Sequence, residues 1–234
     1  MTSPQTDLST ARGFGALLLT GIVFGVLSSV PALEYPDYLV KLPTLETQVL
    51  VAVFAQAAMA LTYAWIAALT HRLVKRYDPG LATAYLGLRM VGSGFLFVGI
   101  ASLLLLLWFS QNALSVDAAA PSYVQITGEL LRRGRDMLNH IGMILPWSIG
   151  GLILYYSFYK TKLVPRWLSV WGGIGSAATL VATILLMLNI IEMATPAYFV
   201  MNTPLALLEV TLAVFLLAKG FRARPPSSEA TSFS

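Results

Sequence analysis

The stretch WLSVWGGIGSAATLVATILLMLNII, residues 167–191, decides the fold class of this chain. It contains no charged residue. A helix needs about 20 apolar residues to cross the ~30 Å hydrocarbon core of a bilayer. A run of this length and composition therefore predicts a transmembrane helix.

Five further apolar runs of similar length lie elsewhere in the chain, at residues 13–33, 47–70, 82–109, 136–159 and 203–221. Hydrophobic residues make up 57% of the sequence and charged residues 11%, against about 25% charged residues in soluble domains. We expect an all-α integral membrane bundle of six transmembrane helices over residues 13–221. Residues 1–12 would form an N-terminal tail and residues 222–234 a disordered C-terminal tail. The first run is too long for the apolar part of a signal peptide, so we expect it to be retained.

Basic residues in the connecting segments predict the orientation of the six spans. Ten Lys and Arg residues fall on the side that holds both termini, and four fall on the other side, namely Lys41, Arg132, Arg133 and Arg135. Because Lys and Arg are in excess in cytoplasmic loops, we expect both termini to be cytoplasmic.

The composition also excludes several classes of function. The chain has no cysteine, which rules out disulfides, thiolate metal sites and cysteine nucleophiles. No HExxH or comparable ligand spacing is present, so we expect no metal and no cofactor. The basic residues lie in short loops rather than along one face, which argues against a nucleic-acid partner.

Two ionisable residues inside apolar runs are the first candidates for a functional site. Arg89 lies in the third run and Glu209 in the sixth, at depths that differ by only about 5 Å at the helical rise of 1.5 Å per residue. A guanidinium near the bilayer centre costs about 2.5–3.5 kcal/mol, and a carboxylate nearby would relieve that cost. Three interpretations stay open: a structural ion pair that sets helix register, a site that binds a ligand or a proton, and separate extension to the two surfaces.

A second candidate group lies at the start of the fourth run. Asp136 and His140 are four residues apart, so an α-helix would place them on one face, with Asn139 alongside. Asp136 would then orient His140, which could shuttle a proton or bind a polar headgroup. The alternative is that Asp136 only caps a helix N-terminus.

Membrane lipids are the expected partners of the basic loops. Lys and Arg residues next to interfacial tryptophans suit anionic headgroups, and the residues concerned are Arg72, Lys75, Arg76, Lys160, Lys162, Arg166, Trp167 and Trp171. Small residues such as Gly21 and Gly25 would let helices approach closely, within the chain, in a homo-oligomer or against a partner helix.

The segment around the fourth run leads to two structural predictions. Residues from Pro121 onward predict an amphipathic helix whose apolar side lies on the membrane surface. Pro146 lies inside the fourth run and should break its hydrogen-bond ladder.

Three stretches resemble a known bacterial family of multi-pass membrane proteins. They are YLGLRMVGSG at 85–94, KLVPRWLSVWG at 162–172 and PLALLEVTLAVFLLAKGF at 204–221, and the chain is similar to the DUF4386 family from about residue 10 to 222. Arg89, Arg166 and Glu209 fall on polar positions of these stretches, whereas the part around His140 matches less closely. The resemblance implies a six-span protein of the bacterial inner membrane, and it implies no activity.

We favour a protein that binds a lipid-like or small amphipathic ligand within the bundle, acting in transport, sensing or membrane homeostasis. A second hypothesis is an intramembrane enzyme that uses Glu209 or Asp136 as a general acid on a hydrophobic substrate such as a polyprenyl chain. No aromatic residue lies one turn from Glu209 along its helix, which counts against it. A third hypothesis is a scaffold subunit of a membrane complex.

Overall fold

The computed structural model describes residues 4–113, 121–193 and 195–222, which form helices and no strand. Six helices in this part of the chain are long and apolar enough to cross a membrane, so the predicted all-α membrane bundle is confirmed. The main helices are α1 (Pro4–Leu27), α3 (Glu46–Val74), α4 (Pro79–Ala113), α5 (Pro121–Met137), α6 (Ile144–Thr161), α7 (Arg166–Met187) and α8 (Pro196–Lys219). The short elements are η1 (Pro31–Glu34), α2 (Tyr38–Lys41), η2 (Leu42–Leu45) and the π-helical η3 (Leu138–Met143).

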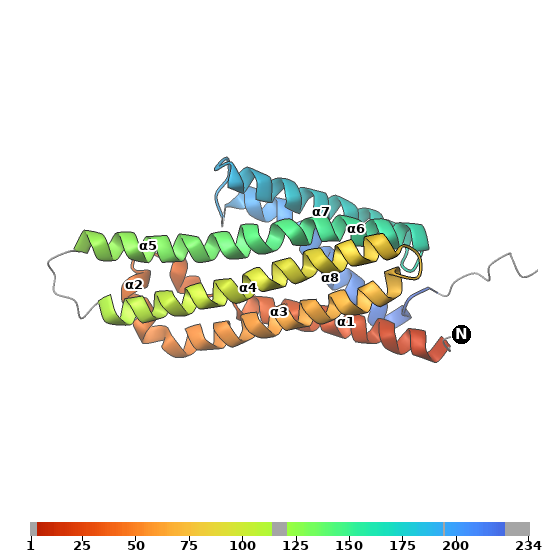
Figure 1. The fold of residues 1–234 in the computed structure, drawn as a ribbon, viewed down its shortest axis with the longest axis horizontal. Coiled ribbons are helices and arrows are strands. Elements are labelled where there is room, and N and C mark those ends of the chain that lie inside the picture. The colour runs from red at the N-terminus through yellow and green to blue at the C-terminus, as the bar shows by residue number, and fades with distance from the viewer. Residues whose placement is uncertain (1–3, 114–120, 194, 223–234) are drawn as a thin grey trace, which may run out of the picture.

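The six spans form a closed ring. Each spanning helix packs against the next one along the chain, and α8 returns to pack against α1. Figure 1 shows the N-terminus and the α3–α4 and α6–α7 connections at one end of the molecule, which we call the basic end. The start of α5 and the short helix α2 lie at the opposite end, the α5 end. The facing of these ends toward cytoplasm or exterior stays a prediction.

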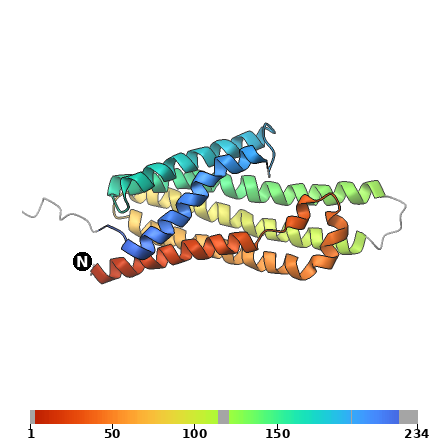
Figure 2. The same cartoon turned by 180° about the vertical axis from the view of Figure 1, so that it is seen from behind.

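The spans differ in length. Helices α7 and α8 have 22 and 24 residues, close to the length that crosses a bilayer. The apolar helical stretches Tyr38–Val74, Pro79–Ala113 and Ser122–Thr161 have 37, 35 and 40 residues. These longer helices extend past the ends of α7 and α8 at the α5 end (Figures 1 and 2).

The first helix covers different residues from those expected. It begins at Pro4 rather than near Gly13, and it ends at Leu27 rather than Leu33. The hydroxyls of Ser28 and Ser29 donate hydrogen bonds to backbone carbonyls of the last turn, at 2.8 and 2.7 Å, and compete with helix continuation.

The last two helices also differ at their outer ends. The fifth span stops at Met187 rather than residue 191, and Asn189 adopts a φ of 55° in the turn that follows. The sixth begins at Pro196 rather than Thr203, because Pro is favourable at the first position of a helix and the Thr195 hydroxyl accepts a bond from the Tyr198 amide. Pro204 therefore lies inside α8.

The amphipathic helix expected after Pro121 is present as α5, and its placement on the membrane surface stays a prediction. Helix α5 continues the axis of α6 through η3, and it runs beside α4 (Figure 1). Leu131 packs on the cluster that contains Leu33 and Leu42, whereas Ile126 and Leu130 are 68% and 70% exposed. The wide turns of η3 end just before Pro146, where the sequence predicted a break. Residues 114–120 and the predicted disordered tail from residue 223 onward lie outside the described residues.

Two hydrophobic clusters fill the bundle, one toward each end. The cluster at the α5 end joins α3, α4 and the 30–42 segment, and the cluster at the basic end joins all six spans. Polar residues separate the two clusters: Gln56 on α3 is 2% exposed and Arg89 on α4 is 8% exposed. This polar layer positions the candidate sites.

Candidate functional site

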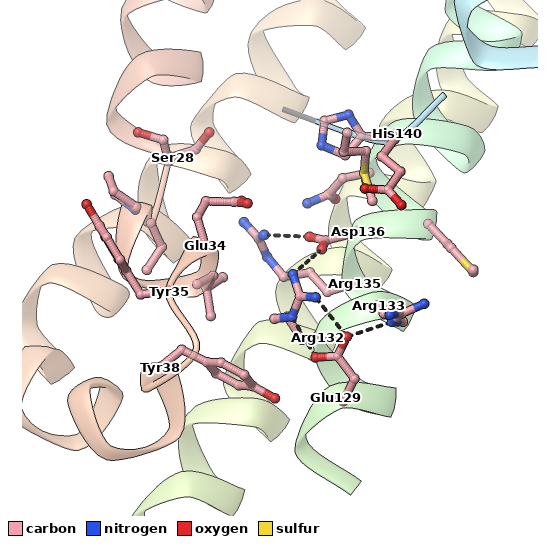
Figure 3. Close-up of a pocket in the computed structure, with 18 of the residues that line it drawn as sticks. Ser28, Glu34, Tyr35, Tyr38, Glu129, Arg132, Arg133, Arg135, Asp136 and His140 are labelled. Carbon is pink, nitrogen blue, oxygen red and sulfur yellow. Dashed lines mark hydrogen bonds and ion pairs between the residues drawn. The ribbon is translucent and has the colours of Figure 1, made fainter. Parts of the chain in front are cut away.

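A cavity of ≈ 1700 Å³ lies at the α5 end, where α7 and α8 stop short of the longer helices. We call it the large cavity. Its walls come from the 28–40 segment, α5, η3 and the connection between α7 and α8. Figure 3 shows the side chains of Glu34 and Tyr38 facing the charged residues of α5 across this space.

A network of ion pairs covers the α5 wall of the large cavity. Arg132 makes two hydrogen bonds to Glu129, at 2.9 Å from Nε and 2.8 Å from Nη2, and Arg133 Nε lies 2.6 Å from the same carboxylate. Asp136 accepts from Arg135 at 3.1 Å and from Arg132 at 3.4 Å. The spacing of three or four residues places Glu129, Arg132 and Asp136 on one helical face, so α5 builds the network from its own sequence.

Arg135 belongs to this network and has a buried hydrogen-bond donor without a partner in the described residues. Its side chain is 11% exposed, and its Nε–H has no partner among the described residues. Glu34, across the cavity in Figure 3, forms no ion pair with it in the described part of the chain. A buried donor of this kind costs free energy unless water or a ligand accepts from it.

The pairing of Asp136 with His140 expected from their spacing is not what the structure contains. The His140 Nδ1 lies 2.7 Å from the Tyr198 hydroxyl, and the two rings meet edge to face. The reason is η3, which begins at Leu138. A π-helical turn holds more residues than an α-helical turn, so it rotates His140 away from the face of Asp136 and toward α8.

Asn139 lies at the floor of the large cavity and is tied to α3. Gln56 Nε2 donates to Asn139 Oδ1 and to the Leu96 carbonyl, both at 3.0 Å. Gly99 makes this contact feasible, because a Cβ at that position would overlap the Asn139 amide. Gln56 is not among the site residues expected from the sequence; its signal there is an amide inside an apolar run.

Arg89 and Glu209 line a second, smaller cavity of ≈ 190 Å³ among α4, α6, α7 and α8. We call it the small cavity. No ion pair joins the two residues among the described side chains. Glu209 Oε2 instead accepts a hydrogen bond of 3.1 Å from the Tyr63 hydroxyl. The structure thus places both residues at one site without the direct bridge that their depths suggested.

Aromatic side chains from α3, α4 and α6 surround the Arg89 guanidinium. Its Cζ lies 5.0 Å from the Trp147 ring, 5.4 Å from the Tyr85 ring and 5.9 Å from the Tyr63 ring. Trp147 Nε1 also donates to the Arg89 carbonyl at 3.1 Å. Cation–π contacts in a desolvated site contribute about 2 kcal/mol. These aromatics could not be found along the helix of Glu209, because they come from α3, α4 and α6.

The residues expected to touch lipid headgroups lie at the basic end. Trp167 and Trp171 stack with centroids 6.1 Å apart, and Arg166 lies over the Tyr159 ring at 5.3 Å. The remaining basic residues of this set, Arg72, Lys75, Arg76, Lys160 and Lys162, are exposed. Their contact with lipid stays a prediction.

The paired glycines of the first span face the interior of the bundle. A Cβ at Gly21 would meet the Tyr63 ring at 3.0 Å, and one at Gly25 would meet Met59 Sδ at 3.3 Å. They therefore bring α1 close to α3. In the described residues no group of three His, Asp or Glu side chains could hold a metal ion.

Comparison with known proteins gives one family. The family described as Domain of unknown function (DUF4386) matches residues 14–220, nearly the whole chain. Neither the curated proteins nor the solved structures yield a match. With six apolar spans and a family match of this extent, the chain is a multi-pass membrane protein that belongs to the DUF4386 family.

Proposed function

We propose that this protein binds a lipid-like or small amphipathic molecule in the large cavity, in the service of transport, sensing or membrane homeostasis. The observation that carries the proposal is the cavity itself, whose ≈ 1700 Å³ exceeds the ~300–1000 Å³ of sites for drug-sized ligands. It has room for a hydrocarbon chain as well as a headgroup.

The α5 wall suits the polar end of such a ligand. Arg132 and Arg133 are engaged by Glu129, whereas Arg135 keeps a buried Nε–H without a partner in the described residues. An acceptor on the ligand would satisfy that donor. His140 and Tyr198 add a second polar pair to the lining.

The lining near the ends of α7 and α8 suits the apolar part. It contains Leu186, Ile191, Met193 and Phe199. Since α7 and α8 have the length of a bilayer crossing, their ends belong near the boundary between hydrocarbon and headgroups. An amphipathic molecule bound there can place its polar group at the headgroup level and its apolar part in the hydrocarbon.

The test is native mass spectrometry of the gently extracted full chain, with lipid analysis of whatever it retains. We expect one defined amphipathic species in the wild type and in Arg72→Gln, an exposed control at the basic end. Retention should fall about tenfold or more in Arg135→Gln, which loses a charged donor. A bare, monodisperse wild-type protein would refute ligand binding, and a stoichiometric protein partner would favour the scaffold hypothesis.

The small cavity does not suit the alternative of an enzyme that processes a polyprenyl chain at Glu209. At ≈ 190 Å³ it equals about six water molecules at roughly 30 Å³ each, far below the volume of such a substrate. The volume therefore favours ligand binding at the large cavity over catalysis at Glu209.

A further inference from the structure

The small cavity collects polar groups that lack partners. The Arg89 Nε, the Ser176 Oγ and the Thr179 Oγ1 are buried, and none of the three has a hydrogen-bond partner among the described residues. All three residues line this cavity. Buried polar atoms without partners are rare, and three on one cavity point to an occupant that bonds to them.

Four helices build this site from one face each. Helix α6 contributes Ser148 and Gly151, α7 contributes Ser176 and Thr179, and α8 contributes Asn202, Leu205 and Glu209, while Arg89 comes from α4. Helices α7 and α8 approach closely here, because a Cβ at Gly175 would meet the Leu205 backbone at 3.1 Å. The contact between α7 and α8 beside the cavity is therefore a close approach of the two backbones.

The charges of the site are opposite and separated. Arg89 is 8% exposed and permanently cationic, and no carboxylate in the described residues forms an ion pair with it. Glu209 lines the same cavity and is bonded to the Tyr63 hydroxyl. The guanidinium and the carboxylate thus both have hydrogen-bonding capacity left for a molecule between them.

We propose that the small cavity is a binding site for a small zwitterion of the amino-acid type, with its carboxylate on Arg89 and its ammonium on Glu209. Such a ligand is neutral overall, so the occupied site adds no net charge to the apolar interior. A lone anion or cation would add one, and burying an uncompensated charge is costly. The hydroxyls of Ser176 and Thr179 would donate to the ligand carboxylate.

The volume limits the size of the ligand. A space of about six water molecules accepts a molecule of roughly five to seven non-hydrogen atoms. Glycine, β-alanine and 4-aminobutyrate cover that range, and their charges are separated by one, two and three carbons. This site is independent of the large cavity and does not rest on the function proposed there.

Isothermal titration calorimetry on the purified full chain tests the proposal with these three compounds, and with acetate and methylammonium at equal concentration and ionic strength. We expect binding of at least one zwitterion and at least tenfold weaker binding of acetate and of methylammonium. Acetate binding as tightly as the zwitterion would overturn the proposal in favour of an anion site. No binding by any compound would also overturn it and leave a site for water only.

Variants of the cavity wall test whether the zwitterion binds in the small cavity. Ser176→Ala and Thr179→Val should each weaken the affinity for the zwitterion about tenfold, because each removes a donor to a charged group. Thr183→Val is the matched control: Thr183 lies one turn further along α7, donates to the Thr179 carbonyl and is not part of the cavity wall. Binding that survives both Ser176→Ala and Thr179→Val unchanged would place the ligand elsewhere and refute the proposal.

Discussion

The Tyr63 hydroxyl donates a hydrogen bond of 3.1 Å to Glu209 Oε2, and the ring of the same tyrosine lies 5.9 Å from the Arg89 guanidinium carbon. One aromatic side chain from α3 therefore contacts both the cation of α4 and the anion of α8. The two charges line the same cavity, and they form no direct ion pair with each other in the described residues.

Tyr63→Phe should lower the free energy of unfolding by about 1–3 kcal/mol, because it leaves the Glu209 carboxylate without its phenol donor. The ring contact with Arg89 is preserved. Thermal or denaturant unfolding in detergent measures the change. Tyr85→Phe is the matched control, since the Tyr85 hydroxyl is buried with no partner among the described residues, and its removal should cost little. Equal losses in the two variants would contradict the bridging role of Tyr63.

Gly92→Ala should destabilise the bundle by about 1–3 kcal/mol through overpacking. A Cβ at Gly92 would overlap the indole of Trp147, which is fixed by its hydrogen bond to the Arg89 carbonyl. Gly94→Ala, two residues along the same helix, meets no atom within 4 Å and should stay within about 1 kcal/mol of wild type. The prediction fails if the two substitutions have the same effect on unfolding.

Asp136→Asn should cost about 3 kcal/mol, because it breaks a largely buried ion-pair network and leaves Arg135 without its acidic partner. Asp37→Asn is the control, since the Asp37–Lys41 pair is exposed by 54% and 44% and such pairs contribute about 0–1 kcal/mol. The free energies of unfolding of both variants, measured in the same detergent, test this prediction. A tolerated Asp136→Asn would mean that the network on α5 serves ligand binding without stabilising the fold.

The orientation can be measured by labelling, because the chain has no cysteine of its own. Arg76→Cys lies at the basic end and Tyr123→Cys near the start of α5, and both parent side chains are exposed. In intact cells a membrane-impermeant maleimide should label Tyr123→Cys and spare Arg76→Cys until the cells are lysed. The reverse pattern would overturn the cytoplasmic placement of the termini.

Some of the candidate site could be read from the sequence. Arg89, Glu209, Asp136, Asn139 and His140 all line one of the two cavities. Their partners could not be read in the same way. Gln56 is an amide in an apolar run, and Tyr63, Trp147 and Tyr198 are aromatic residues of a type that fills any membrane bundle.

The sequence by itself determined the class of the protein and the number of its spans. Hydropathy and the need for about 20 apolar residues per crossing are local properties, so they can be read one segment at a time. The tertiary structure decided which polar groups meet. Each span is apolar around most of its circumference, so no single hydrophobic face specifies its rotation. The π-helical η3 then turned His140 from Asp136 to Tyr198, and the packing of α3 between α1 and α4 brought Tyr63 to Glu209. Rotation and register depend on contacts with neighbouring helices, and these exist only in the folded bundle.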